Sequence, residues 1–153
     1  MTVAAVLVPV SQANAYVTYS SDECSSSTRC FAIFYNSLQS IGIFSSACFL
    51  TNKTHDSHTG FDHLTPSGMQ QVRFEFGRDK GIALPNGSKC RAVQPGSGDV
   101  VKNNAAGASN ADSRSHRIYF NSNQTGAYQT FTTGVNKNLI SSLKNENASS
   151  ARL

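Results

Sequence analysis

The sequence predicts an all-β protein built as a sandwich of two copies of one unit, stapled by disulfides, with a long insertion in the first copy. Three observations lead to this fold class. Charged residues make up only 14% of the 153 residues, and Ser, Asn, Thr and Gly take their place, which favours strands and turns over long helices. Apolar and alternating segments are short, with turn residues about every 8–12 positions. One stretch of the chain is also present twice, and duplicated short-stranded units suggest a sandwich.

The duplicated stretch joins an aromatic strand to an Asn-Ser turn and then, further on, to a second Asn-rich turn. Residues 33–39 read Ile-Phe-Tyr-Asn-Ser-Leu-Gln, and residues 118–124 read Ile-Tyr-Phe-Asn-Ser-Asn-Gln. The later turns are Val-Lys-Asn-Asn-Ala-Ala at 101–106 and Leu-Lys-Asn-Glu-Asn-Ala-Ser-Ser at 143–150. We therefore predict two copies of one structural unit.

The two copies differ in length. Asn121 and Asn145 are 24 positions apart, whereas Asn36 and Asn103 are 67 apart, so the first unit carries 43 additional residues between its two turns. The predicted organisation is a single domain over residues 16–153, with motif one at about 24–109, its insertion at about 50–98 and motif two at about 116–153.

The first 15 residues are typical of a secretory leader. Residues 3–10 are apolar over a length too short to span a bilayer, and Ala13-Asn14-Ala15 is a small-x-small cleavage site. The positive segment expected before the apolar run is absent, which suggests that Met1 is internal to a longer leader. The alternative is an apolar N-terminal strand, although the segment lacks period-2 alternation. We expect a secreted protein that begins near Tyr16 and does not bind membranes.

Export gives the cysteines a structural interpretation. Cys24, Cys30, Cys48 and Cys90 are even in number, and an oxidising compartment favours two disulfides out of three possible connectivities. The first two enclose a loop of hairpin size, so we pair them, which leaves Cys48 with Cys90 and ties together the two ends of the insertion. A zinc site is the other use of four cysteines, but the spacings fit no paired C-x-x-C pattern.

Several segments have the pattern of strands. Residues 30–35 and 43–50 are apolar and aromatic and predict a buried hairpin, and residues 72–76 alternate cleanly. Residues 81–93 predict a second hairpin around Asn86-Gly87. Further strands are predicted at 117–120, 128–132 and 138–140. The remaining segments predict a polar lead-in at 16–29, an exposed loop at 51–71 and a linker at 107–115.

The charge pattern argues against nucleic-acid binding. The net charge of +4 would allow an acidic partner, but the 13 basic residues are scattered, with no run of Lys and Arg and no aromatic interleaving. We interpret the positive charge as a mildly basic solvated surface.

The aromatic pair Phe34-Tyr35 followed by Gly42 resembles the start of a βγ-crystallin Greek-key motif, and Gly126 has the matching place in the second unit, one residue early. Within that superfamily, the sequence is similar to secreted actinobacterial proteins of peptidase inhibitor family I36. The similarity covers about residues 24–44 and 100–150 and leaves the insertion unmatched. It implies two Greek keys packed about a pseudo-twofold axis and inhibition of an extracellular peptidase, in particular a metallopeptidase.

The resemblance also implies candidate calcium ligands. Many βγ-crystallins bind calcium through two Asn or Asp residues, two variable residues and two hydroxyl residues, and oxygen-rich turns suit Ca²⁺. The second unit offers Asn145, Glu146, Ser149 and Ser150, whereas the first keeps Asn103 and Asn104 but lacks both hydroxyls. The alternative is that these Asn and Ser side chains satisfy backbone groups of tight turns, in which case no cofactor is required.

A second group of metal-binding residue types lies in the insertion. It contains His55, His58 and His63 with Asp56 and Asp62. His at i and i+3 could bind zinc on a turn, but a solvated loop is the simpler interpretation. We also expect His116 to be an ordinary strand residue.

The insertion also holds the candidate inhibitory loop. An inhibitor needs a rigid, exposed loop that loses little entropy when it enters a protease cleft. Lys89, Cys90 and Arg91 lie beside the Asn86-Gly87 turn, next to a predicted disulfide, and a hairpin without a partner is the alternative. No Gly-x-Ser-x-Gly, His-Glu-x-x-His or phosphate-binding loop is present, so we expect no enzyme activity.

The sequence thus favours a secreted, monomeric binding protein that inhibits an extracellular peptidase. The alternative is a calcium-binding or calcium-stabilised βγ-crystallin protein that is structural or binds surfaces.

Overall fold

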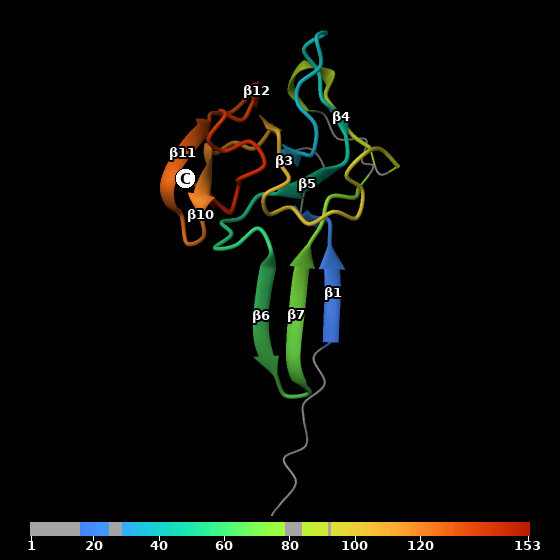
Figure 1. The fold of residues 1–153 in the computed structure, drawn as a ribbon, viewed down its shortest axis with the longest axis vertical. Coiled ribbons are helices and arrows are strands. Elements are labelled where there is room, and N and C mark those ends of the chain that lie inside the picture. The colour runs from blue at the N-terminus through green and yellow to red at the C-terminus, as the bar shows by residue number, and fades with distance from the viewer. Residues whose placement is uncertain (1–15, 25–28, 79–83, 92) are drawn as a thin grey trace, which may run out of the picture.

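The computed structural model describes residues 16–24, 29–78, 84–91 and 93–153, so the predicted leader at 1–15 lies outside the described residues. The fold is all-β: its elements are strands and one 3₁₀ turn, and no α-helix occurs in the described part. Figure 1 shows a rounded body of several sheets from which a narrow arm of strands projects. Within the described ranges, no helix has the length and apolar character needed to cross a membrane.

The larger sheet of the body has five strands in the order β12-β9-β3-β5-β2. Their bounds are β12 Asn136–Asn138, β9 Gly107–Asn110, β3 Phe31–Phe34, β5 Cys48–Thr51 and β2 Asp22–Glu23. The central strands β3, β5 and β9 are buried at every residue. This confirms the buried apolar hairpin, whereas the predicted linker at 107–115 is wrong at its start, because 107–110 forms a central strand.

Strand β9 consists of small residues, a composition that is also typical of a linker. The structure explains why one of them, Gly107, is small. Gly107 lies against the ring of Phe44, and a Cβ atom at this position would come within 2.4 Å of that ring. Phe44 in turn stacks on Phe34, with ring centroids 4.4 Å apart. The strand therefore has a small residue because a neighbouring aromatic side chain occupies the space.

The second sheet of the body has the order β11-β10-β13, with β10 at His116–Asn121, β11 at Thr125–Phe131 and β13 at Ser149–Arg152. Its inner side chains, Ile118 and Phe131, belong to the same buried cluster as Phe31, Ile33 and Phe49 of the larger sheet. The two sheets therefore pack face to face around a shared apolar core. A second cluster fills the other side of the larger sheet.

The two halves of the chain exchange segments. Strand β12, from the second half, pairs with β9 of the first half. Conversely, His55 of the first half bridges to Ser150 in β13, with N···O distances of 2.8 and 3.0 Å in the two directions. The Asn-rich turns repeat this reciprocity, because Asn103 N donates to Asn147 O and Asn145 N donates to Ala105 O, both at 2.8 Å. Each half therefore adds backbone hydrogen bonds to a sheet of the other half.

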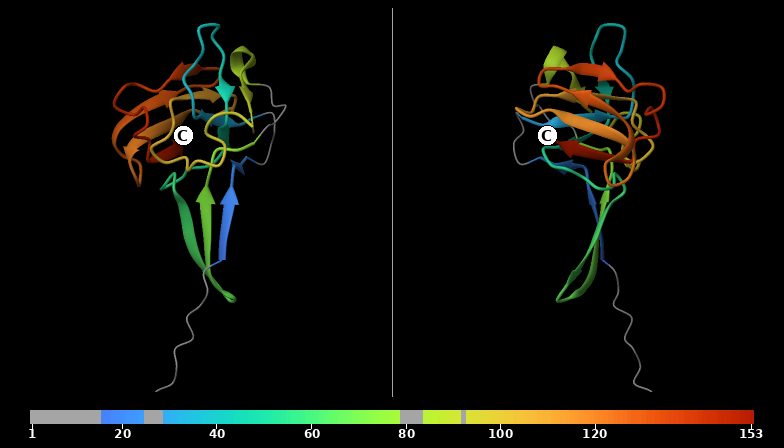
Figure 2. Two further views of the ribbon diagram at one scale, coloured as in Figure 1. Left: turned by 45° about the vertical axis from the view of Figure 1, so that its right-hand side comes forward. Right: turned by 90° about the vertical axis from the view of Figure 1, so that its left-hand side faces the viewer.

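The arm is a three-stranded sheet in the order β1-β7-β6, with β1 at Tyr16–Ser20, β6 at Gly60–Thr65 and β7 at Gly68–Phe74. β6 and β7 form an antiparallel hairpin, and β1 runs parallel to β7. Figures 1 and 2 show the arm extending away from the body in all three views. The predicted polar lead-in at 16–29 and exposed loop at 51–71 are therefore wrong, because both contain strands.

The end of the body opposite the arm carries the second part of the insertion. The 3₁₀ turn η1 spans Pro85–Gly87, and β8, Lys89–Cys90, pairs in parallel with β4, Ser45–Ser46. The predicted hairpin over 81–93 is wrong in its pairing: Cys90 lies beside Ser46, while residues 81–83 lie outside the described residues.

Both predicted disulfides are confirmed: Cys24 bonds Cys30 and Cys48 bonds Cys90. They are consistent with an oxidising environment.

Candidate functional site

Residues 84–91, here called the basic loop, are held in place from several directions. The Ser88 hydroxyl accepts a hydrogen bond from Phe44 N at 2.9 Å, and Lys89 N donates to Phe44 O at 3.2 Å. Arg91 N donates to Ser46 O at 3.0 Å, and the Cys48–Cys90 disulfide ties the loop to the end of β5. The loop is therefore fixed along its length by bonds to the neighbouring chain.

Asn136 fixes the turn at the start of the basic loop. Its side-chain amide donates to Pro85 O at 2.7 Å and to the Ser88 hydroxyl at 2.9 Å. Asn136 belongs to the second half of the chain, so the basic loop is attached to both halves. No local pattern in the sequence indicates a role for this residue, because the contact spans about 50 positions.

The basic loop presents two cationic side chains to solvent. Lys89 and Arg91 are exposed and two residues apart, and neither forms an ion pair with an acidic group in the described part of the chain. Cys90 between them is completely buried. The loop can therefore contact a partner through Lys89 and Arg91, whereas Cys90 acts only as the brace.

The two Asn-rich turns each have a left-handed Asn at the matching position. Asn103 and Asn145 both adopt left-handed conformations, with φ of 61° and 60°, which Asn tolerates better than most residues. Asn104 donates to the carbonyls of Val100 and Lys102, within its own turn. Asn103, Asn104 and Asn145 therefore have structural roles in their turns. This supports the alternative to calcium binding, in which the Asn side chains serve the tight turns themselves.

The hydroxyl residues of the second turn are mostly internal. Ser149 donates to Asn121 O at 2.6 Å and accepts from Gln124 N at 3.0 Å, while Ser150 is buried and its hydroxyl has no partner among the described residues. Glu146 is exposed on the surface of the turn. These candidates therefore do not point into a common cage.

Part of the candidate calcium set does share a pocket. A cleft of about 260 Å³ is lined by Tyr35, Asn36, Ser37, Asn104, Ala106, Lys144 and Asn145. It brings the Asn-Ser turn of the first unit together with both later Asn-rich turns. The cleft offers amide and hydroxyl oxygens, but Lys144 also adds a positive charge.

Asn147, between the predicted calcium ligands, is a structural residue that the sequence reasoning missed. Its Oδ1 accepts from Ala105 N, and its Nδ2 donates to Val101 O, both at 2.8 Å. These backbone partners fix the orientation of the amide, so the same Nδ2 must donate to Nδ1 of His58 at 2.9 Å. Because Nδ1 accepts this bond, His58 is neutral with its proton on Nε2.

Two of the predicted loop histidines are buried, which corrects the interpretation of a solvated cluster. His58 is completely buried, and His55 packs against the rings of Phe49 and Phe74 with its Nε2 2.7 Å from the Thr51 hydroxyl. Burial lowers the pKa of His55 to about 4 and that of His58 to about 3. Only His63 of the three is exposed.

A charged cluster lies at the C-terminal edge of the second sheet. Asp112 accepts two hydrogen bonds from Arg152, at 2.6 and 3.0 Å, and one from Nε2 of His116 at 2.9 Å. Burial raises the pKa of Asp112, but the hydrogen bonds from Arg152 and His116 outweigh it and hold the pKa well below its usual range. Burial lowers the pKa of His116 despite this carboxylate.

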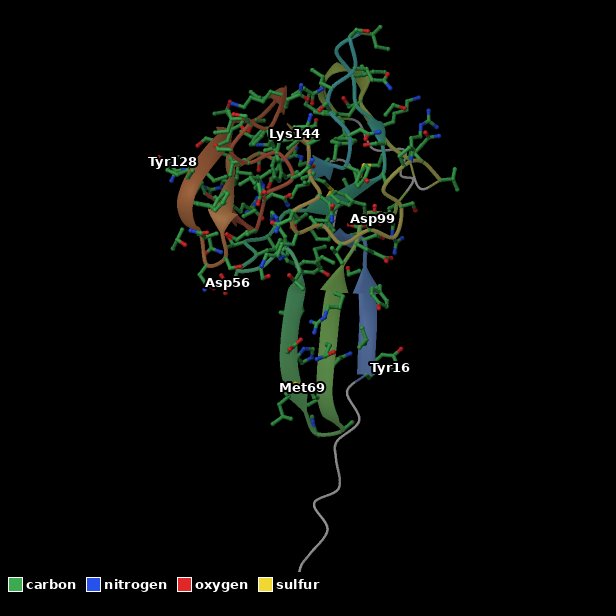
Figure 3. All side chains as sticks on the ribbon, viewed as in Figure 1. Tyr16, Asp56, Met69, Asp99, Tyr128 and Lys144 are labelled. Atoms are coloured by element: carbon green, nitrogen blue, oxygen red, sulfur yellow. A yellow bond between two sulfur atoms is a disulfide. The ribbon has the colours of Figure 1, made fainter. Side chains whose placement is uncertain are left out.

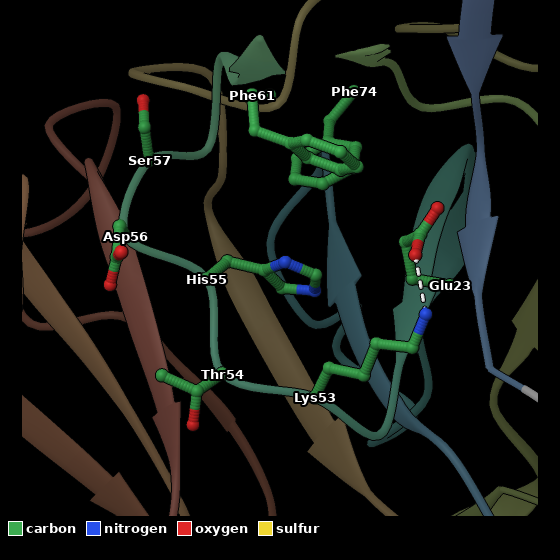
Figure 4. Close-up of a pocket in the computed structure, with 9 residues that line it drawn as sticks. Glu23, Lys53, Thr54, His55, Asp56, Ser57, Phe61 and Phe74 are labelled. Carbon is green, nitrogen blue, oxygen red and sulfur yellow. Dashed lines mark hydrogen bonds and ion pairs between the residues drawn. The ribbon is translucent and has the colours of Figure 1, made fainter. Parts of the chain in front are cut away.

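A second pocket, of about 280 Å³, lies where the arm meets the body (Figure 4). The rings of Phe61 and Phe74 form one wall, and the ion pair between Lys53 and Glu23, 2.8 Å apart, forms the other. Burial raises the pKa of Glu23, but hydrogen bonds from Lys53 and Ser20 lower it overall. Lys53 and Glu23 are thus paired with each other, and the third charged residue of the pocket, Asp56, accepts a hydrogen bond from Gln124 at 3.0 Å.

The searched ranges contain no group of three or more His, Cys, Asp or Glu side chains placed to hold a metal ion. Comparisons with protein-family models, with curated proteins and with solved structures found no match to this chain. The basic loop is the strongest candidate site on geometric grounds, because it combines a fixed backbone with exposed basic side chains that form no ion pair within the described residues.

Proposed function

We propose that this chain is a secreted binding protein that inhibits an extracellular peptidase through the basic loop. The observation that carries the proposal is the combination of a braced backbone and two exposed basic side chains at residues 84–91. The peptidase as target rests on the resemblance of the sequence to secreted actinobacterial peptidase inhibitors, and a metallopeptidase is the specific expectation.

A βγ-crystallin-like arrangement of two Greek keys is part of the same proposal. In such an arrangement the two Greek-key units pack against each other in one sandwich. The pairing of β12 with β9 and the bridge between His55 and Ser150 are the contacts that support it. The hairpin β6-β7 of the arm and the basic loop then both belong to the insertion in the first motif, whereas β1 precedes that motif.

The bracing explains how a short loop could bind tightly. A flexible loop loses about 1–2 kcal/mol of conformational free energy for each residue that it orders on binding. Here the disulfide, the hydrogen bonds to Phe44 and Ser46 and the side chain of Asn136 order the loop before any partner arrives. Binding energy from Lys89 and Arg91 would therefore appear as affinity.

Inhibition assays test this proposal directly. The full chain is titrated into a thermolysin-like metallopeptidase and into serine peptidases that cleave after basic residues. Inhibition at 1:1 stoichiometry is expected for at least one, and Lys89→Ala with Arg91→Ala should weaken it at least ten-fold. Lys137→Ala, a basic residue of β12 outside the basic loop, is the control and should inhibit like the wild type. Full peptidase activity at large molar excess would refute the proposal.

Calcium-stabilised structural or surface binding is a second candidate, favoured by the cleft that gathers Asn36, Asn104 and Asn145. It ranks second because Lys144 lines the same cleft and repels a divalent cation. If calcium binds the folded chain, millimolar calcium raises the melting temperature relative to EDTA, and Asn36→Ala with Asn104→Ala, two residues that line the cleft, reduces the difference. Identical melting curves in calcium and EDTA would eliminate this candidate.

A further inference from the structure

The arm is a sheet without a covering layer. Figure 3 shows the side chains of Tyr16 and Met69 projecting from the arm with no other element over them. Tyr16, Tyr19 and Leu64 are 69%, 64% and 78% exposed, and Phe61 and Val17 are also exposed. A three-stranded sheet that leaves so many large apolar side chains in water is typical of a surface that associates with something else.

The outer strand of the arm, β1, has an unprotected edge. Within the described residues it lies at the end of its sheet and pairs along its length only with β7. Its sequence, Tyr-Val-Thr-Tyr-Ser, contains no charge, proline or glycine and has high β propensity. Natural edge strands usually carry charges, prolines or bulges that prevent pairing with another chain, and β1 has none of these.

The sequence of β1 is complementary to itself. In an antiparallel pairing of two β1 strands centred on Thr18, each Val17 lies opposite the Tyr19 of the other copy. Aromatic and β-branched residues are a favourable cross-strand pair, and the pairing occurs twice because of the two-fold symmetry. The remaining neighbours, Tyr16 opposite Ser20, are neutral and leave no charge facing another.

The charge of the arm also favours a neutral partner. Arg73 and Asp62, on neighbouring strands of the arm, form an ion pair with each other at 2.6 Å. The arm therefore lacks the basic excess that an acidic surface or nucleic acid would need. The partner surface should therefore carry no net charge, and the β1 edge of a second copy of this chain is such a surface.

We propose that two copies of this chain associate through antiparallel pairing of their β1 strands, which forms a continuous six-stranded sheet from the two arms. The bodies then lie at opposite ends of the joined sheet, with both basic loops at the ends far from it. Figures 1 and 2 show β1 along the outer side of the arm. The proposal replaces the monomer expected from the sequence, and it does not depend on the proposed inhibition.

Sedimentation of the full chain from micromolar to submillimolar concentration tests the association. A monomer–dimer equilibrium in this range is expected for the wild type. Thr18→Lys and Thr18→Glu place like charges opposite each other at the two-fold axis and should each raise the dimer dissociation constant at least ten-fold. An equimolar mixture of the two variants places Lys opposite Glu and should restore the dimer. Leu64→Lys adds the same charge to β6, away from the β1 edge, and is the control.

A wild type that remains monomeric over the whole concentration range would overturn the proposal. A Leu64→Lys variant that dimerises as weakly as Thr18→Lys would also overturn it, because it would indicate that the dimer packs through the faces of the arms. A monomer that sediments with neutral phosphatidylcholine vesicles would identify a membrane as the occupant and would equally overturn it. If either charged variant fails to fold, Thr18→Cys gives a second readout. A short bis-maleimide should cross-link it into dimers, whereas Leu64→Cys should remain uncross-linked.

Discussion

Acidification from pH 7 to pH 5 should strongly destabilise the fold, because His55 and His58 are buried in neutral form. In the unfolded chain both imidazoles take up protons near the ordinary pKa of about 6.5. In the folded protein burial lowers these pKa values to about 4 for His55 and about 3 for His58. Between these limits the unfolded state binds more protons, so the stability is complete above pH 6.5 and falls as the pH decreases toward the folded pKa values.

The size of the effect follows from linkage. Each histidine that is protonated only in the unfolded state costs about 1.4 kcal/mol per pH unit below 6.5, which amounts to about 1.8 kcal/mol between pH 7 and pH 5. His55 and His58 together should therefore lower the free energy of unfolding by about 3.6 kcal/mol. The lowered pKa of His116 adds to the loss, whereas the carboxylates of Asp112 and Glu23 contribute mainly below about pH 5.

His58 allows the sharpest test, because protonation of its Nδ1 would turn the hydrogen bond from Asn147 into a contact between two donors. Urea unfolding at pH 7, 6 and 5 gives the pH dependence for the wild type and for His58→Gln. The variant should be less stable at pH 7 by about 1–3 kcal/mol, because buried polar partners are left unsatisfied. The difference in stability between this variant and the wild type should be smaller by about 2 kcal/mol at pH 5. The reason is that the substituted glutamine takes up no proton on unfolding, whereas His58 does.

Thr59→Ala, an exposed neutral change next to His58, is the control and should keep the wild-type pH dependence. A wild-type free energy of unfolding that stays constant between pH 7 and pH 5 would refute the reasoning. So would a His58→Gln variant whose deficit is the same at every pH.

Three further predictions concern the packing of the body, and each is measured by urea unfolding at pH 7. Removal of the Cys48–Cys90 disulfide by serine substitution should cost about 4 kcal/mol, because the bridge closes a loop of 42 positions; a loss below about 1 kcal/mol would contradict this. Gly107→Ala should lower the stability by about 2–3 kcal/mol, because the added methyl group meets the ring of Phe44. Gly42→Ala, where nothing lies within 4 Å, should cost only about 1 kcal/mol for its positive φ. Equal costs would argue against the close packing of Gly107 on Phe44. Arg152→Ala should cost about 2–4 kcal/mol, since it removes two hydrogen bonds from a buried carboxylate, and a neutral effect would count against that pairing.

Part of the body could be predicted from the sequence, because two of its three central strands, β3 and β5, are locally distinctive, whereas β9 was predicted as a linker. Residues 31–34 and 48–51 are uninterrupted apolar runs, and they form buried neighbouring strands. The disulfides followed from the number and spacing of the cysteines. In these cases the local pattern and the tertiary environment agree.

Only the end of β7 was predicted in the arm, by the alternation of residues 72–76, and the rest of the arm could not be predicted for a physical reason. Both of its faces contact water, so Gly60–Thr65 shows none of the alternation that marks a half-buried strand. Its first strand pairs in parallel with β7, more than 50 positions along the chain. No local signal reports such a contact.

The candidate site was predicted in part. Lys89 and Arg91 are exposed as expected, but the turn before them is held by Asn136 and by pairing with β4 instead of a local hairpin. His55 and His58 were misassigned because their burial depends on the exchange of segments between the two halves. Both errors come from contacts between residues far apart in the sequence.

The central claim is that the basic loop binds because it is ordered in advance, and the inhibition constant of Asn136→Ala tests it most directly. This variant removes two hydrogen bonds from the loop and leaves Lys89 and Arg91 unchanged. The matched control is Gln129→Ala, which removes a comparable amide brace from residues 138–140. We expect about a ten-fold loss of inhibition for Asn136→Ala, less than two-fold for the control, and unchanged inhibition stoichiometry. Equal inhibition by Asn136→Ala and the wild type would contradict the claim.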